Sequence, residues 1–178
     1  MKLTEKQIDR LVSLIFRSLK EQNLMEFKAK ETDVFARGCQ FVSKEYAKEK
    51  ALEEKAEKMM DDLERQNPGS FQRYKMFPML KTRLAKEQKL VLEDRISHFV
   101  SLIVDGLWKD DVVDYTDEDK AMRVAKRAGV DFEKEINDID TKAREKVASL
   151  KRNVLEGTPE WDVMYKKYYE EELQKRGN

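Results

Sequence analysis

Cysteine, histidine, glycine and proline are all scarce in this chain, and their scarcity excludes several classes of protein. Cys39 is the only cysteine and His98 the only histidine, so an internal disulfide and a zinc site built from such ligands are both excluded. Six glycines and three prolines among 178 residues leave few places for loops. Glycine-rich phosphate loops, nucleophile elbows and dinucleotide fingerprints are missing as well. We therefore expect no metal and no cofactor, and no motif supports an enzymatic activity.

Long apolar runs and a net charge are also missing. Nowhere do eighteen apolar residues follow one another, and the opening MKLTEKQIDRLVSL has no apolar run of signal-peptide length, so we expect a soluble, cytoplasmic protein with no membrane partner. Lys and Arg balance Asp and Glu at 36 each, with a net charge of +4 over residues 1–88 and −4 over residues 89–178. Neither half is charged strongly enough to predict a nucleic-acid partner by itself. The high charged fraction of 40% resembles usage in thermophiles.

One feature that the chain does have is an internal repeat. The string IDRLVSLIFRSL at residues 8–19 returns as ISHFVSLIVDGL at residues 96–107, an offset of 88, and at the same offset LMEF at residues 24–27 meets VVDY at residues 112–115. We predict two units, residues 1–88 and 89–178, packed together as one compact body.

Apolar spacing of three and four residues predicts an amphipathic helix at the start of each unit, with Thr4 and Gln7 as a capping box. In the second unit Thr116 signals a helix that we expect Gly129 to end, with a longer helix after it. Because no Gly or Pro follows Pro78 before the second unit, we expect a largely helical connection over residues 79–108.

The segments MEF at residues 25–27 and VDY at residues 113–115 alternate in polarity, so they can pair as an antiparallel ribbon or remain extended loops. The predicted fold class is all-α. It consists of two tandem helical units related by pseudo-twofold symmetry, with a very short two-stranded ribbon between them.

The stretch RNVLEGTPEWDVMYKKYYEE at residues 152–171 crowds a Gly, a Pro, a Trp and three Tyr together. One interpretation is structural, because Gly157 ends a turn, Thr158 caps a helix and Pro159 is its first residue. The other is a binding surface, since aromatic rings between cations are favoured at interfaces. Its candidate residues are Arg152, Asn153, Trp161, Tyr165, Lys166, Tyr168 and Tyr169.

The C-terminal string SLKRNVLEGTPEWDVMYKKYYEEELQKRG and the opening MKLTEKQIDRLVSLI resemble the bacterial family called domain of unknown function 507. The resemblance covers the second unit from end to end and the first unit more loosely. It implies an architecture of one or two such units and leaves the activity open. In the first unit QNPGSF at residues 66–71 has no Trp and lacks the acidic residues, which implies that any site there has been lost. In the second unit the resemblance rests on Arg152, Asn153, Glu156, Gly157, Thr158, Pro159, Glu160, Trp161 and Asp162.

Three functions remain as hypotheses. The first is a non-enzymatic interaction or scaffold module that binds a protein partner through the aromatic C-terminal helix. The second is nucleic-acid binding through Arg152, Lys166, Lys167 and Arg176 beside the tyrosines. The third and least supported is an enzyme that uses buried carboxylates or His98.

Two other features favour structural roles. The acidic run DDVVDYTDED at residues 110–119 lacks the spacing and the central Gly of a calcium loop, so we expect it to be solvated and to cap a helix. Cys39 has no neighbouring catalytic signature, and we expect it to be a small buried apolar residue.

Overall fold

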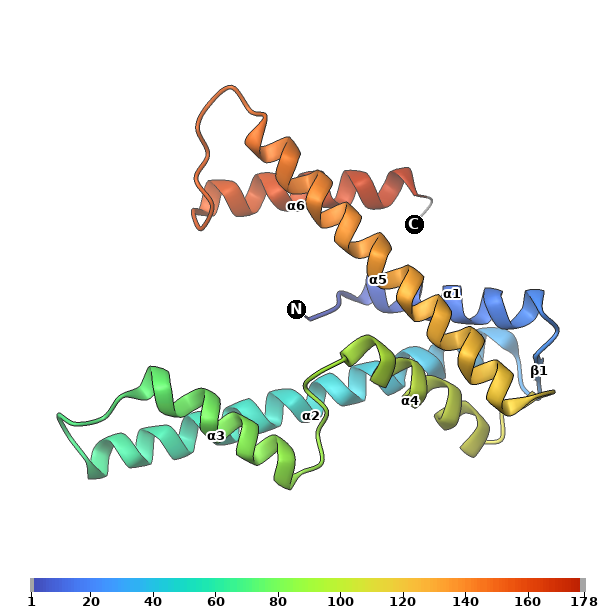
Figure 1. The fold of residues 1–178 in the computed structure, drawn as a ribbon, viewed down its shortest axis with the longest axis horizontal. Helices are drawn as coiled ribbons and strands as arrows, with labels where there is room; N and C mark the ends of the chain where they lie inside the picture. The colour runs from blue at the N-terminus through green and yellow to red at the C-terminus, as the bar shows by residue number, and fades with distance from the viewer. Residues whose placement is uncertain (1, 177–178) are drawn as a thin grey trace.

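The computed structural model describes residues 2–176, which fold into six helices and two short strands (Figure 1). The predicted all-α fold with its short ribbon is confirmed. In chain order the elements are α1 (Glu5–Glu21), β1 (Met25–Phe27), α2 (Glu31–Gln66), α3 (Arg73–Glu87), α4 (Arg95–Lys109), β2 (Val113–Tyr115), α5 (Glu118–Ala148) and α6 (Pro159–Lys175).

The main core belongs to both predicted units at once. Helix α1 packs mainly against α5, and helix α4 packs against both α2 and α5, so each opening helix contacts the long helix of the other unit. Leu11 and Val12 of α1, like Phe99 and Val100 of α4, are almost completely buried in this core. Burial of each such side chain contributes about 1.5–3 kcal/mol to the free energy of unfolding. Both halves of the sequence therefore contribute side chains to this core.

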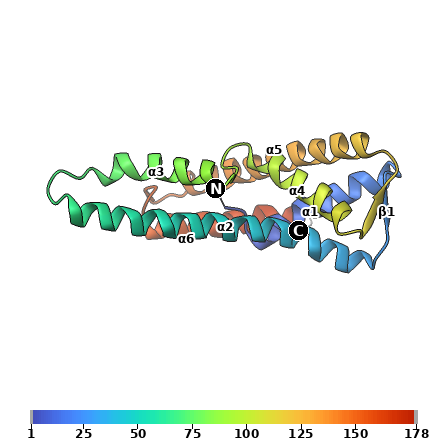
Figure 2. The ribbon, with the colours of Figure 1, turned by 90° about the horizontal axis from the view of Figure 1, so that it is seen from below.

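The ribbon joins the same two units. Strands β1 and β2 pair antiparallel, with Met25 opposite Tyr115, Glu26 opposite Asp114 and Phe27 opposite Val113. The central pair consists of residues that are 88 positions apart, the offset of the sequence repeat. This register is the one that a twofold axis through the central pair would produce. Figure 2 shows the ribbon at one end of the molecule, opposite the turn between α2 and α3.

Helix ends follow local signals, with two corrections. Thr4 and Gln7 form the predicted capping box of α1. The cap of α5 is Asp117, whose side chain accepts a hydrogen bond from the Lys120 backbone, so the prediction of Thr116 is wrong by one residue. Gly129 does not end a helix, because α5 continues through it. A Cβ at Gly129 would lie 2.9 Å from Val100 Cγ2, so this glycine permits the close crossing of α4 over α5.

The predicted connection over residues 79–108 is largely helical, but a turn divides it into two helices. Helix α3 ends at Glu87 and α4 begins at Arg95, and the backbone between them takes positive φ angles at Lys89 and Asp94. Leu90 and Leu92 of this segment pack against the small apolar cluster between α2 and α3. Burial of these two leucines stabilises the turn, although helix propensity alone would favour a continuous helix. Pro78 lies inside α3 without ending it.

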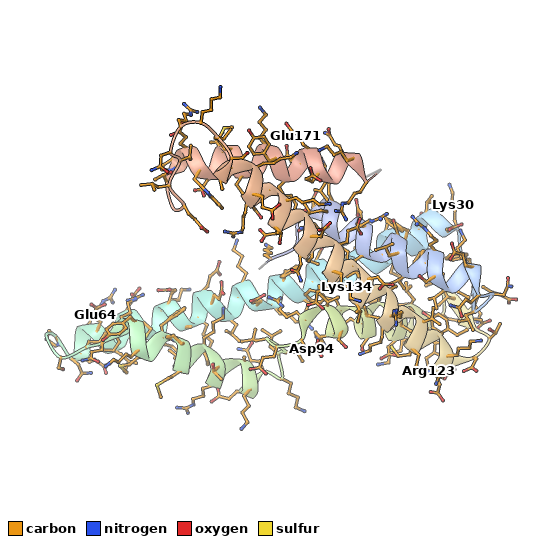
Figure 3. The ribbon with its side chains drawn as sticks, turned by 45° about the horizontal axis from the view of Figure 1, so that its top comes forward. Lys30, Glu64, Asp94, Arg123, Lys134 and Glu171 are labelled. Carbon is orange, nitrogen blue, oxygen red and sulfur yellow. The ribbon has the colours of Figure 1, made fainter. Side chains whose placement is uncertain are left out.

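Two helical arms extend from the core and diverge from each other (Figure 1). We call residues 50–87, which comprise the end of α2 and α3, the first arm. Residues 136–176, which comprise the end of α5 and α6, are the second arm. Glu64 lies near the tip of the first arm (Figure 3). Within residues 2–176, no helix combines the length and the apolar character needed to cross a bilayer.

Candidate functional site

The second arm owes its geometry to the turn that precedes α6. Gly157 takes a φ of 87°, a conformation that other residues rarely adopt. The Thr158 hydroxyl then accepts a hydrogen bond from the Trp161 backbone at 3.3 Å, and Pro159 is the first residue of α6. The predicted turn, cap and helix start are all present. They direct α6 back along α5.

Trp161, Tyr165 and Tyr169 form an aromatic ladder along α6, because residues four apart lie on the same side of a helix. The rings of Trp161 and Tyr165 are stacked, with centroids 4.9 Å apart and planes at 7°. Tyr169 continues the series at 5.8 Å from Tyr165. The guanidinium of Arg144 on α5 lies 5.3 Å from the Trp161 ring and 5.5 Å from the Tyr165 ring. The ladder therefore packs against α5 on this side.

The two tyrosine hydroxyls connect the ladder to other elements. Tyr165 donates a hydrogen bond to Asp140 of α5, and Tyr169 accepts one from the side-chain amide of Gln7 in α1. Burial raises the pKa of Tyr165, and the hydrogen bond to Asp140 raises it further. Burial also raises the pKa of Tyr169, although the Gln7 contact opposes this shift. Both phenols stay protonated at neutral pH and act as hydrogen-bonding anchors.

A groove of about 520 Å³ lies between the start of α1 and α6, and we call it the α6 groove. Its apolar surface comes mainly from Tyr165, Tyr169 and Leu173. Charged and polar groups surround this surface: Lys2, Thr4, Glu5, Lys6, Gln7, Lys166 and Glu170. Three of the seven candidate residues, Tyr165, Lys166 and Tyr169, thus meet in one concave site.

The other candidate residues lie outside this groove. Trp161 is part of the ladder but does not line the groove. Tyr168 lies beside two lysines, Lys146 and Lys167, whose ammonium groups are within 6 Å of its ring centroid. Arg152 and Asn153 are exposed in the loop before α6, and Arg152 forms an ion pair with Glu160 at 2.7 Å.

Glu172 is a buried carboxylate that holds the end of α6 to α5. It is 6% exposed, and it accepts ion pairs from Lys146 of α5 and from Lys175, each at 2.8 Å. The hydrogen bond from Lys146, followed by that from Lys175, lowers the pKa of Glu172 from 4.5 to about 2. The carboxylate is therefore ionised over the whole physiological range.

His98 and Cys39 both make structural contacts. His98 Nε2 lies 3.1 Å from Glu45 Oε1, which links α4 to α2. Cys39 is partly buried and its thiol donates to Asp9 at 3.4 Å. Burial, and then the contact with Asp9, raises the pKa of Cys39 to about 12, so a thiolate nucleophile is not formed at neutral pH. Within residues 2–176 no three His, Cys, Asp or Glu side chains are grouped to hold a metal ion.

Several residues of the site were not predicted from the sequence. Arg144 and Asp140 contact the ladder from α5, and Lys2 and Lys6 line the groove from the start of the chain. Gln7 was predicted only as a capping residue. Its contact with Tyr169 joins positions 162 residues apart, and no local pattern signals such a pairing.

The whole chain, residues 1–178, matches the family model described as "Protein of unknown function (DUF507)". No curated protein matches the chain.

Proposed function

The chain belongs to the DUF507 family, and from that premise we propose that it is a non-enzymatic interaction module that binds a partner protein through the α6 groove. The observation that carries the proposal is the convergence of Tyr165, Tyr169 and Leu173 in one concave, mainly apolar site. Tyrosine is enriched among residues that dominate binding energy, because its large rigid ring loses little entropy on binding.

The rim of the groove indicates the chemistry of the partner. Lys2, Lys6 and Lys166 line it, and within residues 2–176 none of the three has a carboxylate within 4.0 Å. Glu5 and Glu170 supply fewer charges of the opposite sign. An apolar side chain flanked by carboxylates would fill the groove and place its charges beside the lysines. The partner we propose is a protein segment of this kind.

The nucleic-acid hypothesis for α6 has less support. Of its four cations, Arg152 is paired with Glu160 and Arg176 is paired with Asp138. Among the described residues, only Lys166 and Lys167 have no carboxylate partner. Two unpaired positive charges attract a polyanion such as nucleic acid only weakly.

Adjacent lysines on α6 allow a matched test. Lys166 lines the groove and Lys167 does not, although both are exposed. We expect Lys166→Glu to weaken binding of the partner about five- to tenfold, since a rim charge then repels the partner's carboxylates. Lys167→Glu should leave binding within twofold. The measurement is a pulldown from the source organism with quantitative mass spectrometry, followed by titration of each purified partner against wild type and both variants.

Circular dichroism checks that both variants remain folded. If every purified partner binds the two variants equally, the α6 groove is not the binding site. If the affected partner binds through a basic segment, the assignment of its chemistry is wrong.

A further inference from the structure

The seam between α1 and α5 differs in chemistry at its two ends. At one end Arg10 of α1 forms a two-pronged ion pair with Glu135 of α5, with both N–O distances at 3.1 Å. Both side chains are largely removed from solvent, at 18% and 14% exposure. Here a cation on one helix meets a carboxylate on the other, which is the arrangement expected of a contact that holds two helices together.

The other end of the seam has cations without such partners. An open groove of about 420 Å³, the α1/α5 groove, is lined by Lys120, Arg123 and Arg127 of α5. Among the described residues, neither Lys120 nor Arg123 has a carboxylate within 4.0 Å. Arg127 lies 3.6 Å from Asp131 of its own helix, the one acidic residue in the lining, and both side chains are mostly exposed.

Helix α1 contributes no carboxylate to this groove. The groove is lined on this side by Ser18 of α1 and by Gln22, which directly follows α1, and both are uncharged hydrogen-bonding groups. Val124 and Ala128 of α5 form the remaining surface. A hydroxyl, an amide and three cations around a shallow hollow are groups that bind an anion.

The seam between α4 and α2 provides an internal comparison. There Asp110, at the end of α4, accepts an ion pair from Arg37 of α2 at 2.9 Å. Asp110 is 88 residues after Gln22, so the two occupy the same position in the predicted repeat. The carboxylate that neutralises a cation in one seam is thus replaced by an amide in the other. The cations of the α1/α5 groove are available for a ligand.

We propose that the α1/α5 groove binds the phosphodiester backbone of a nucleic-acid strand. Lys120, Arg123 and Arg127 follow one face of α5 and span seven residues, or about 10 Å along the helix axis. A line of this length suits consecutive phosphates of a strand better than one isolated phosphate group. The lining contains no aromatic ring on which a base could stack, so recognition is independent of sequence.

This site is separate from the α6 groove, and it does not depend on the function proposed for that groove. Figure 3 shows Arg123 near the N-terminal end of α5, whereas α6 packs on the opposite end of the same helix. Binding through about three phosphate contacts is weak and depends on salt. Its association constant should fall about fifteen- to twentyfold when salt rises from 25 to 100 mM.

The test measures fluorescence anisotropy of a fluorescein-labelled 20-nucleotide oligo-uridine with the full chain. Gln22→Asp restores the carboxylate that the other seam has, and we expect it to weaken binding at least fivefold. Arg123→Gln should weaken binding about fivefold and reduce the steepness of the salt dependence, because one phosphate contact is lost. Lys58→Gln, on the first arm and outside the groove, should bind as wild type does. Thermal melts establish that each variant is folded.

Weaker binding by both groove variants, with unchanged binding by Lys58→Gln, supports the proposal. Equal binding by wild type and folded Arg123→Gln would overturn it, as would an absence of binding at 25 mM salt. Binding of phosphatidylglycerol vesicles or inorganic polyphosphate without any binding of oligo-uridine would also overturn it.

Discussion

The two arms follow one plan, a long helix with a shorter helix folded back on it, but they are closed by different interactions. At the tip of the first arm, Arg73 pairs with three carboxylates of α2: Glu57, Asp61 and Glu64. All of these side chains are at least 36% exposed. In the second arm the aromatic ladder and the buried Glu172 hold α6 against α5. Solvent screens exposed ion pairs, so each contributes little to stability, whereas partly buried contacts contribute more.

The arms also differ in their connection to the core. The second arm is attached to α1 through the hydrogen bond between Gln7 and Tyr169. The first arm relies on a small apolar cluster of its own, formed by Leu52, Ala56, Leu84 and Ala85. Its outer surface carries two large exposed side chains, Tyr74 at 74% and Met79 at 73% exposure. We infer that the first arm opens as a separate unit and that the second arm is coupled to the core.

The largest effects should come from truncating one buried residue in each arm. Leu52→Ala and Ile139→Ala each remove a side chain that is at most 1% exposed, and each should cost about 2–5 kcal/mol. Amide hydrogen exchange should show that Leu52→Ala lowers protection only within the first arm, in the end of α2 and in α3. Ile139→Ala should lower it in α6 and at the start of α1, because Tyr169 links the two.

Met59→Ala, which truncates a residue that is 37% exposed on the first arm, serves as the control for Leu52→Ala. Reduced protection of α1 in the Leu52→Ala variant would show that the first arm does not open separately.

Acid should weaken the second arm through protonation of Glu172. The pKa of Glu172 is lowered to about 2 in the folded chain, so its ion pairs stabilise the fold above pH 4.5, its ordinary pKa. This contribution is lost as the pH falls from 4.5 towards 2. Trp161 fluorescence, measured in a Trp108→Phe background, should therefore change over that range. Glu172→Gln should remove this part of the acid response, and Glu171→Gln, whose carboxylate is 42% exposed, should keep it. An identical acid profile for both variants would contradict the role of Glu172.

The smallest effects should come from the exposed apolar residues of both arms. Met79→Gln on the first arm and Val163→Gln on the second should each change the free energy of unfolding by less than about 0.5 kcal/mol. Urea denaturation provides the measurement. If only one of the two variants lowers the free energy of unfolding by more than about 1 kcal/mol, that side chain makes a stabilising contact in spite of its exposure.

Local signals predicted the helix ends well because the groups involved are close in sequence. Thr4 and Gln7 are three residues apart, and so are Thr158 and Trp161, so the capping hydrogen bonds follow from the chain itself. The same reasoning failed at Gly129. There the glycine is needed for the approach of Val100, which comes from another helix, and the local signal is the same as that of a helix end.

The candidate site was predicted only in part, for the same reason. Tyr165 and Tyr169 were identified because aromatic crowding is visible in a linear sequence. Asp140 and Gln7, which bind their hydroxyls, are 25 and 162 residues away and carry no distinguishing pattern. The packing of α6 on α5 determines which aromatic rings of α6 face the groove, and a linear sequence does not reveal such tertiary contacts.

The packing of α1 on the long helix of the other unit has a consequence for assembly. A polypeptide that held only residues 1–88 would expose the apolar stripe of α1 that α5 covers, and a second copy of the same unit is the simplest surface that could cover it. Connecting the units through residues 88–94 makes this encounter intramolecular. The core can then form at any protein concentration, without the dilution sensitivity of a dimer.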